Sequence, residues 1–366
     1  MTRLGLYAAV TNHGFGHATR VAAVLAELQQ RRPQLEIELT LVTCAPEWLL
    51  RACIPGPFNY RPRVLDVGVV QGDSRTMDKA ATLAKLENIQ ERQASIISEE
   101  AAFIRDQGID LVLGDIPPLA GPIAQAAGVP CWMMGNFGWD YIYRPWIEQM
   151  PRFGPICDWI ADCFSQCDRL FRLPFHEPMA AFPEIKDVGL TGGSPSYDPA
   201  VLRQRFSITA PRERTVLMTF GGLGIDNVPY DGLAAFADWQ FITLDKDVPV
   251  LPNLLQVDGV DYRPVDFMPL CDRILSKPGY GTFSEACRQN VGVMTIQREG
   301  FSETPLLLAG LRQQLPHRVL SDADFFSGDW AFLKKPLEPA TAETRLSHDG
   351  NSVIATAVSA YFASTT

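Results

Sequence analysis

The chain of 366 residues is long enough for roughly two domains of about 150 to 200 residues, and its 46% hydrophobic content can fill a core in each. Acidic residues outnumber basic ones by 42 to 32, and the formal charge of −10 argues against a nucleic-acid-binding protein, which usually carries a clustered basic excess. The sequence has neither a secretory signal pattern nor an apolar run of about 18 residues. We therefore expect a cytoplasmic protein without a transmembrane segment, with peripheral membrane contact left open.

The eight cysteines form no compact framework and no Cys-x-x-Cys pair, so we expect free thiols in a reducing compartment. Cys157, Cys163 and Cys167 could be read as metal ligands, but no pair of histidines lies near them and helical spacing explains them equally well. The sequence therefore predicts no metal site and no bound cofactor.

The first half of the chain alternates between strand and helix patterns. Residues 4–10 form a continuous apolar run, typical of a strand buried on both faces of a parallel sheet, and residues 18–30 carry apolar side chains at helical spacing. Further strands are expected at 37–43, 109–113, 129–134 and 169–173, and further helices at 47–52, 76–107, 122–127 and 155–167. This alternation predicts an α/β, Rossmann-like domain over residues 1–175.

Residues 176–199 are rich in proline and glycine, which predicts a linker. Beyond it the alternation restarts and predicts a second doubly wound parallel-sheet domain over residues 200–351. Its strands are expected at 215–220, 241–244, 254–257, 271–276 and 291–296, with a helix at 282–289. In the last segment, 352–366, a helical pattern over 352–363 suggests a helix that packs back on the first domain.

A glycine turn follows the first predicted strand and holds a candidate base. Gly14 and Gly16 alone are a weak signal, and they lack the Gly-x-Gly-x-x-Gly spacing of a dinucleotide site, which disfavours an NAD enzyme. His17, where the loop enters the helix, could accept a proton from a hydroxyl, and Asp115 at the end of another strand could fix its tautomer. Alternatively, both side chains cap helices or turns, or His13 serves as the base or as a ligand contact.

A second glycine turn lies in the C-terminal half. Gly279 and Gly281 would let a diphosphate approach the backbone, and Thr282 could donate a hydroxyl hydrogen bond at the helix start. Lys277 supplies a nearby positive charge, and Glu285, one turn into the helix, could bind ribose hydroxyls. The alternative is a capping arrangement in which the glutamate only stabilises the helix end.

Three further segments carry weaker signals. Gly221 and Gly222 form an amide-rich bend after a strand, and Glu299 and Glu303 could meet sugar hydroxyls or simply be solvated at the surface. Residues 136–141 combine aromatic and polar side chains, a composition suited either to stacking on a sugar ring or apolar acceptor or to the edge of a core.

Several of these segments resemble the GT-B glycosyltransferases, especially the group that includes the N-acetylglucosaminyltransferase of peptidoglycan synthesis. The resemblance lies in residues 14–20, 220–222 and 277–286. Residues 136–140 and 172–174 make the chain most similar to the glycosyltransferase-like N-terminal region of plant L-arabinokinases, and the likeness spans nearly the whole sequence. The resemblance lies outside the sugar-kinase domain of those proteins, and we therefore expect no kinase activity from these residues.

The resemblance implies two Rossmann-like domains that face a cleft, with a nucleotide-sugar donor, such as a UDP-sugar, on the C-terminal domain and a hydroxyl acceptor of unknown identity on the N-terminal one. It implies inverting transfer without a metal, with His17 as base and Asp115 as its orienting partner. The donor-binding residues it implies are Gly16, Gly221, Gly222, Lys277, Gly279, Tyr280, Gly281, Thr282, Glu285, Glu299 and Glu303, and the acceptor-binding residues are His13, Asn136, Trp139 and Asp140.

The sequence departs from the family at Glu299 and Glu303, where many related transferases carry an Asp-Gln or Gln-rich pair that binds the sugar. This difference leaves the donor sugar open. Two other functions fit the same fold: a non-catalytic nucleotide-sugar sensor or scaffold, and a sugar epimerase.

Overall fold

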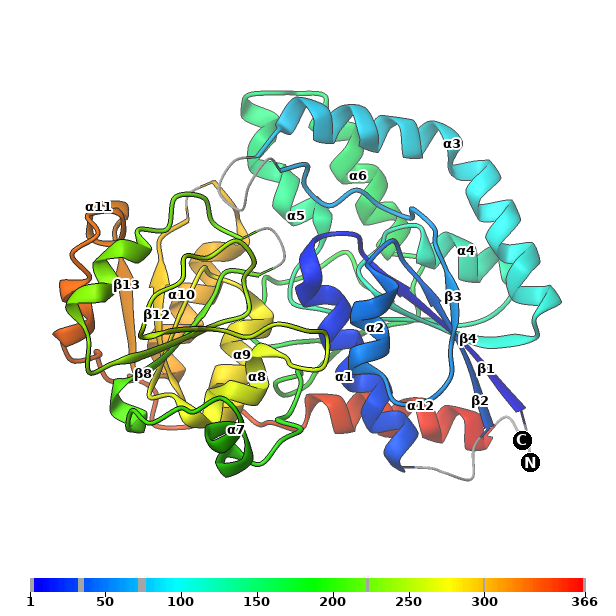
Figure 1. Cartoon of the computed structure of the whole chain (residues 1–366). Helices are drawn as coiled ribbons and strands as arrows, with labels where there is room; N and C mark the ends of the chain where they lie inside the picture. The colour runs from blue at the N-terminus through cyan, green and yellow to red at the C-terminus, as the bar shows by residue number, and fades with distance from the viewer. Residues whose placement is uncertain (1–2, 32–35, 72–76, 222–223, 299, 365–366) are drawn as a thin grey trace. The chain divides into compact units, whose positions relative to one another are not determined.

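The computed structural model describes residues 3–31, 36–71, 77–221, 224–298 and 300–364 (Figure 1). The chain divides into two compact units. Unit 1 comprises the described parts of Met1–Gly72, Thr76–Thr191 and Ser347–Thr366, and unit 2 comprises those of Gly192–Leu346.

The described residues of unit 1 form a seven-stranded sheet in the order β3-β2-β1-β4-β5-β6-β7. All neighbouring strands are parallel, and the central ones are almost fully buried, as their continuous apolar runs predict. The strands are β1 (Arg3–Val10), β2 (Glu36–Val42), β3 (Asn59–Arg61), β4 (Ile109–Asp115), β5 (Cys131–Gly135), β6 (Arg169–Arg172) and β7 (Ile185–Asp187).

Helices cover both faces of this sheet. The long helix α3 begins after Asp78, whose carboxylate accepts a hydrogen bond from the amide of Ala81 at 2.8 Å, and α4 ends where Gly128 takes a left-handed conformation. The α-helices of unit 1 are α1 (Gly14–Arg31), α2 (Glu47–Cys53), α3 (Lys79–Asp106), α4 (Ala120–Ala127), α5 (Trp139–Tyr143), α6 (Phe153–Phe164) and α12 (Gly350–Ser364).

The C-terminal helix α12 returns to unit 1 and packs against α1 (Figure 1). Its buried face carries Ile354, Val358 and Phe362, and the hydroxyl of Tyr361 donates to the carbonyl of Asp110 at 3.2 Å. The final segment of the chain therefore stabilises the helix whose first turn carries His17.

The chain crosses from unit 1 to unit 2 between Thr191 and Gly192, so only part of segment 176–199 belongs to each unit. The linker predicted there contains strand β7. Its backbone groups find their hydrogen-bond partners on β6, and β7 becomes the edge strand of the sheet. Residues 347–351, placed in the second domain by the sequence, belong to unit 1 instead. The amide of Leu190 donates to the carbonyl of Ser347 at 2.8 Å and holds them there.

The described residues of unit 2 form a six-stranded parallel sheet in the order β10-β9-β8-β11-β12-β13. The two parallel α/β units confirm the predicted fold class. The strands are β8 (Thr215–Thr219), β9 (Gln240–Thr243), β10 (Leu254–Gln256), β11 (Arg273–Ser276), β12 (Gly292–Ile296) and β13 (His317–Leu320), and the α-helices are α7 (Pro199–Arg205), α8 (Pro264–Phe267), α9 (Tyr280–Gln289), α10 (Glu303–Gln314) and α11 (Asp322–Phe326).

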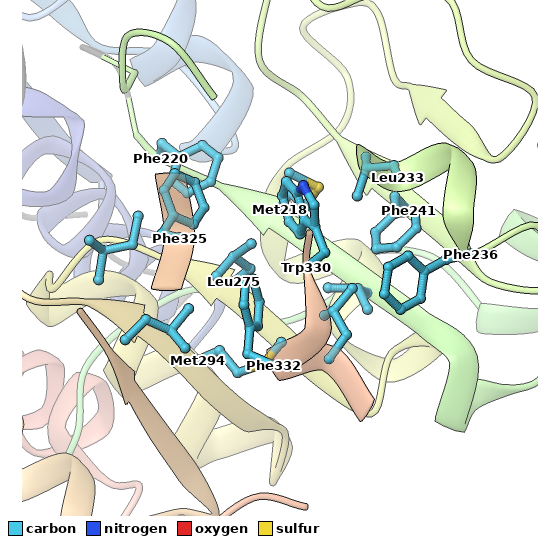
Figure 2. Close-up of a cluster of buried hydrophobic side chains, with 14 of the residues drawn as sticks. Met218, Phe220, Leu233, Phe236, Phe241, Leu275, Met294, Phe325, Trp330 and Phe332 are labelled. Carbon is cyan, nitrogen blue, oxygen red and sulfur yellow. The ribbon is translucent and has the colours of Figure 1, made fainter. Parts of the chain in front are cut away.

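One face of the second sheet carries a large aromatic core (Figure 2). The rings of Phe241 and Phe325 pack against the fully buried Trp330, and Phe220 packs against Phe325. The indole N–H of Trp330 donates to the carbonyl of Pro229 at 2.8 Å. The hydrogen bond removes the cost of burying this polar group. Unit 2 therefore has a hydrophobic core of its own.

Both sheets share one topology, in which the first strand of the unit lies beside the fourth. In unit 1 these strands are β1 and β4, and in unit 2 they are β8 and β11. In such sheets ligands bind outside the carboxyl ends of the strands at the point where the strand order reverses. Each unit therefore has one topologically defined position for a site.

Candidate active site

His17 and Asp115 lie at the reversal point of unit 1. Asp115 is the last residue of β4 and pairs in register with Val10, the last residue of β1, while His17 lies in the first turn of α1. The amide of Thr11 donates to the carbonyl of Asp115 at 3.2 Å, which fixes the two strand ends together. The topology thus unites two side chains that are 98 residues apart.

The two side chains form a hydrogen-bonded pair. Nδ1 of His17 lies 2.8 Å from Oδ1 of Asp115, and their residues are 7% and 0% exposed. A buried carboxylate at this distance holds the imidazole proton on Nδ1 and leaves Nε2 as the proton acceptor. The arrangement has the geometry of a general base with an orienting carboxylate.

Arg20, on the same helix as His17, also binds Asp115 and was not singled out from the sequence. Its Nε and Nη2 atoms donate to the two carboxylate oxygens at 2.5 and 2.6 Å, and Nη1 donates to Oδ1 of Asn136 at 2.8 Å. A side chain three positions after His17 on a helix faces the same side, and this spacing could have revealed it.

Burial and neighbouring charges shift the pKa values of both His17 and Asp115. Burial and the Arg20 guanidinium lower the pKa of His17, although Asp115 opposes them. Burial tends to raise the pKa of Asp115, but the charges of Arg20 and His17 prevail and lower it. His17 is therefore neutral and Asp115 ionised near neutral pH, as proton abstraction by His17 requires.

A second buried carboxylate, Asp66, lies near this pair and carried no signal in the sequence. It accepts hydrogen bonds from the Thr11 hydroxyl, from the amide of Asn12 at 3.0 Å and from the Trp139 indole at 3.2 Å. Burial raises the pKa of Asp66 to about 6.

His13 lies near His17, with 6.4 Å between the two ring centroids. Nδ1 of His13 accepts a hydrogen bond from the amide of Val69 at 3.3 Å.

Two of the predicted acceptor-binding residues, Asn136 and Trp139, are buried beside the first turns of α1. Asn136 is fully buried and accepts from Arg20, and Trp139 is 1% exposed and stacked on Tyr143. Trp139 therefore offers no open face for stacking on a sugar in this conformation. Asp140 is partly exposed, and burial raises its pKa. The acceptor contacts of these three residues and of His13 stay predictions.

The second glycine turn lies at the reversal point of unit 2, where α9 begins. Gly279 is the extended residue before the helix and provides no side-chain cap. The first backbone amides of any helix point beyond its N-terminal end, where the helix dipole is positive. A Cβ placed on Gly279 would meet open space, whereas a Cβ on Gly221, after β8, would lie 3.3 Å from Cε of Lys277. The turn therefore places backbone donors and a lysine at one sheet edge, where an anion can bind.

Asp245, just beyond β9, adds a carboxylate to this edge that the sequence did not reveal. Burial raises its pKa to about 6, while a backbone hydrogen bond from Phe220 and the charge of Lys277 oppose the shift. Its amide donates to the hydroxyl of Thr243 at 3.1 Å. The charge of Lys277 is thus partly balanced by a carboxylate of the protein itself.

Glu285 is turned toward the segment that enters unit 2. Its Oε1 accepts a hydrogen bond from the amide of Gly193 at 2.9 Å, and a Cβ on Gly192 would lie 3.0 Å from its Cγ. Burial raises its pKa, although Arg263 and Arg288 oppose the shift. The ribose contact predicted for Glu285 stays a prediction, and the structure gives one of its oxygens a structural hydrogen bond.

Of the remaining predicted donor residues, Thr282 lies in the first turn of α9 and the others lie on different elements or outside the described residues. Gly16 is exposed on α1, Thr282 is partly exposed on α9, and Glu303 is the buried first residue of α10. Gly222 and Glu299 lie outside the described residues.

Within the described ranges, no group of three or more His, Cys, Asp or Glu side chains is arranged to hold a metal ion. Over the same ranges, no helix has both the length and the apolar character needed to span a membrane.

Several solved structures with this architecture are glycosyltransferases. The glycosyltransferase of kitacinnamycin superimposes with a TM-score of 0.59 at 14% identity, covering 97% of this chain and 95% of that one. Phytolacca americana UGT2, complexed with UDP-2fluoro-glucose and pterostilbene, superimposes with a TM-score of 0.60 at 12% identity, covering 90% and 88%. The fold is therefore that of the GT-B glycosyltransferases.

One relative resembles the chain in sequence as well. The chain is 31% identical over 327 residues to L-arabinokinase of Arabidopsis thaliana, and the match covers 88% of this chain. The chain spans 31% of the length of that relative. No protein-family model matches the chain. These findings confirm the resemblance to arabinokinases, while the likeness to the peptidoglycan enzymes stays a prediction.

Proposed function

We propose that the protein is an inverting, metal-independent glycosyltransferase that moves a sugar from a nucleotide sugar, with UDP as the nucleotide, to a hydroxyl acceptor in the cytoplasm. The observation that carries the proposal is the buried His17–Asp115 pair, 2.8 Å apart at the topological position where α/β sheets bind ligands. The GT-B fold supports it.

In this reaction Nε2 of His17 takes the proton of the acceptor hydroxyl. The hydroxyl oxygen forms a bond to the anomeric carbon while the bond from that carbon to the diphosphate oxygen breaks, and its electron pair leaves with the nucleoside diphosphate. The amides at the start of α9 and the ammonium group of Lys277 stabilise the negative charge of the leaving group. Displacement on the opposite face inverts the anomeric centre.

The test is the release of UDP from a panel of UDP-sugars, with and without a broad panel of hydroxyl acceptors. We expect acceptor-dependent release, and we expect His17→Ala to slow it by at least about 100-fold, because general base catalysis contributes about 10²–10⁴-fold. UDP affinity, measured by calorimetry, should not change. His348→Ala, which removes an exposed histidine of unit 1, is the matched control.

The results separate the competing functions. UDP binding without release from any donor would support a nucleotide-sugar sensor or scaffold, and release that requires no acceptor would support an epimerase or hydrolase. Transfer that survives His17→Ala at full rate would contradict the assignment of the base and would favour His13 in its place.

A further inference from the structure

Arg20 is a buried cation whose three donor groups are all directed at the support of His17. The residue is 3% exposed. Nε and Nη2 bind both oxygens of Asp115 in a side-on, two-point contact, and Nη1 binds Oδ1 of Asn136 at the end of β5. These contacts join Arg20 to the carboxylate that pairs with His17 and to the amide oxygen of Asn136.

The two-point contact fixes the direction of the Asp115 carboxylate. Oδ1 of Asp115 lies 2.6 Å from Nη2 of Arg20 and 2.8 Å from Nδ1 of His17, and both distances are shorter than the 3.0 Å between the two nitrogens. The oxygen can accept from both nitrogens. An unprotonated Nδ1 would direct its lone pair at an ionised oxygen 2.8 Å away, which is repulsive, so the proton lies on Nδ1. Nε2 is then the basic nitrogen.

Arg20 also changes the charge that His17 experiences. An ionised carboxylate alone would stabilise the imidazolium form, but Arg20 and Asp115 together are neutral. The other titratable groups that face this position are His13 in the loop before α1 and Asp66, which interacts electrostatically with Asp115. Phe137 and Trp139, from the β5 side, are uncharged ring neighbours of His17.

We propose that Arg20 is a positioning residue of the active site, which locks the Asp115 carboxylate and offsets its charge so that His17 stays unprotonated with Nε2 as the base. The proposal deepens the proposed function and rests on it only for the catalytic consequence. Its electrostatic part concerns the protein without substrate.

The first experiment is an NMR titration of the histidine side chains in the unliganded protein, with His17 assigned by His17→Gln. We expect His17 to titrate below the ordinary value of about 6.5. In Arg20→Lys, which keeps a positive charge, His17 should also titrate below that value. In Arg20→Gln the Asp115 carboxylate has no compensating cation, and a neighbouring opposite charge shifts a pKa by about 1–3 units. His17 should therefore take up its proton at a pH at least about one unit higher.

The second experiment is the pH dependence of kcat/KM for transfer. We expect the acid limb of Arg20→Gln to move to higher pH by the same amount as the titration, and the limb of Arg20→Lys to stay in place with a lower rate. Arg51→Gln is the control, because it removes an exposed arginine that pairs with Glu47 on the same unit.

Arg20→Gln leaves the buried Asp115 without its cation and is the variant most at risk of misfolding. If Arg20→Gln does not fold, the titration of the wild-type protein still tests the proposal. A pKa of His17 at or above 6.5 overturns it. An unchanged titration in a folded Arg20→Gln protein overturns it as well. Absence of any transfer, together with the expected titrations, would contradict the proposed function and leave the role of Arg20 intact.

Discussion

At the scale of single residues, burial at one end of the first sheet shifts the pKa values of two side chains in opposite directions. It lowers the pKa of His17 and raises that of Asp66 to about 6. The common cause is the cost of taking a charge out of water, which favours the neutral imidazole and the neutral carboxylic acid alike. Asp115 escapes this effect because Arg20 lies against both of its oxygens.

The raised pKa of Asp66 predicts a pH dependence of stability. Because the folded state holds this proton more strongly than the unfolded state, the contribution is present at low pH and is lost as pH rises through about 6. Urea unfolding gives the unfolding free energies of the wild type and of Asp66→Asn. We expect the value for the wild type minus that for Asp66→Asn to be about 1 kcal/mol larger at pH 5 than at pH 7.

Asp106→Asn, which removes an exposed carboxylate at the end of α3, serves as the control for general charge effects. A difference between wild type and Asp66→Asn that stays constant from pH 5 to pH 7 would contradict the assigned pKa shift.

At the scale of elements, the start of α9 has space for a small side chain at Gly279. Gly279 has an extended φ of −169°, which any residue can adopt, and a Cβ there would meet no atom within 4 Å. The glycine is therefore not needed for the turn itself. Its absent side chain leaves the helix amides accessible.

We expect Gly279→Ala to leave the Tm within about 2 °C and to weaken UDP binding about tenfold, which is about 1.4 kcal/mol, because the methyl group stands where the diphosphate would lie. The Tm is measured by calorimetry and the Kd by titration with UDP. Gly154→Ala in α6 is the matched control, since its Cβ would also enter open space. Equal affinity of the two variants would argue against a diphosphate site at this helix.

At the scale of the whole molecule, each unit has its own sheet and its own core. Phe362 of α12 is fully buried in unit 1, and Trp330 is fully buried in the core of unit 2. Truncating a buried aromatic side chain to alanine costs about 3–5 kcal/mol, so each truncation should destabilise one unit.

In calorimetric unfolding we expect Phe362→Ala and Trp330→Ala to lower different transitions. UDP at about 100 times its Kd should raise the transition that Trp330→Ala lowers, since such binding adds about 2.7 kcal/mol to the unit that holds the ligand. Stabilisation of the transition lowered by Phe362→Ala instead would assign the nucleotide to unit 1.

The sequence by itself determined the local features of this protein: buried parallel strands alternating with helices, the two glycine turns, and the histidine at the start of α1. These follow from patterns within short stretches, such as apolar runs and helical spacing. The pairing of His17 with Asp115 could be predicted because Asp115 ends one strand and His17 follows another, and the carboxyl ends of these strands share an edge.

Only the tertiary structure decided which distant groups meet. Arg20 meets Asp115 because the strand order places β4 beside β1. Asp66 joins the site through its hydrogen bonds with the segment after β1 and with Trp139. Strand β7 in the predicted linker and the burial of Trp139 also depend on contacts far along the chain. Hydrogen bonds and desolvation are set by the packed neighbours of a residue, and those neighbours are fixed by the fold.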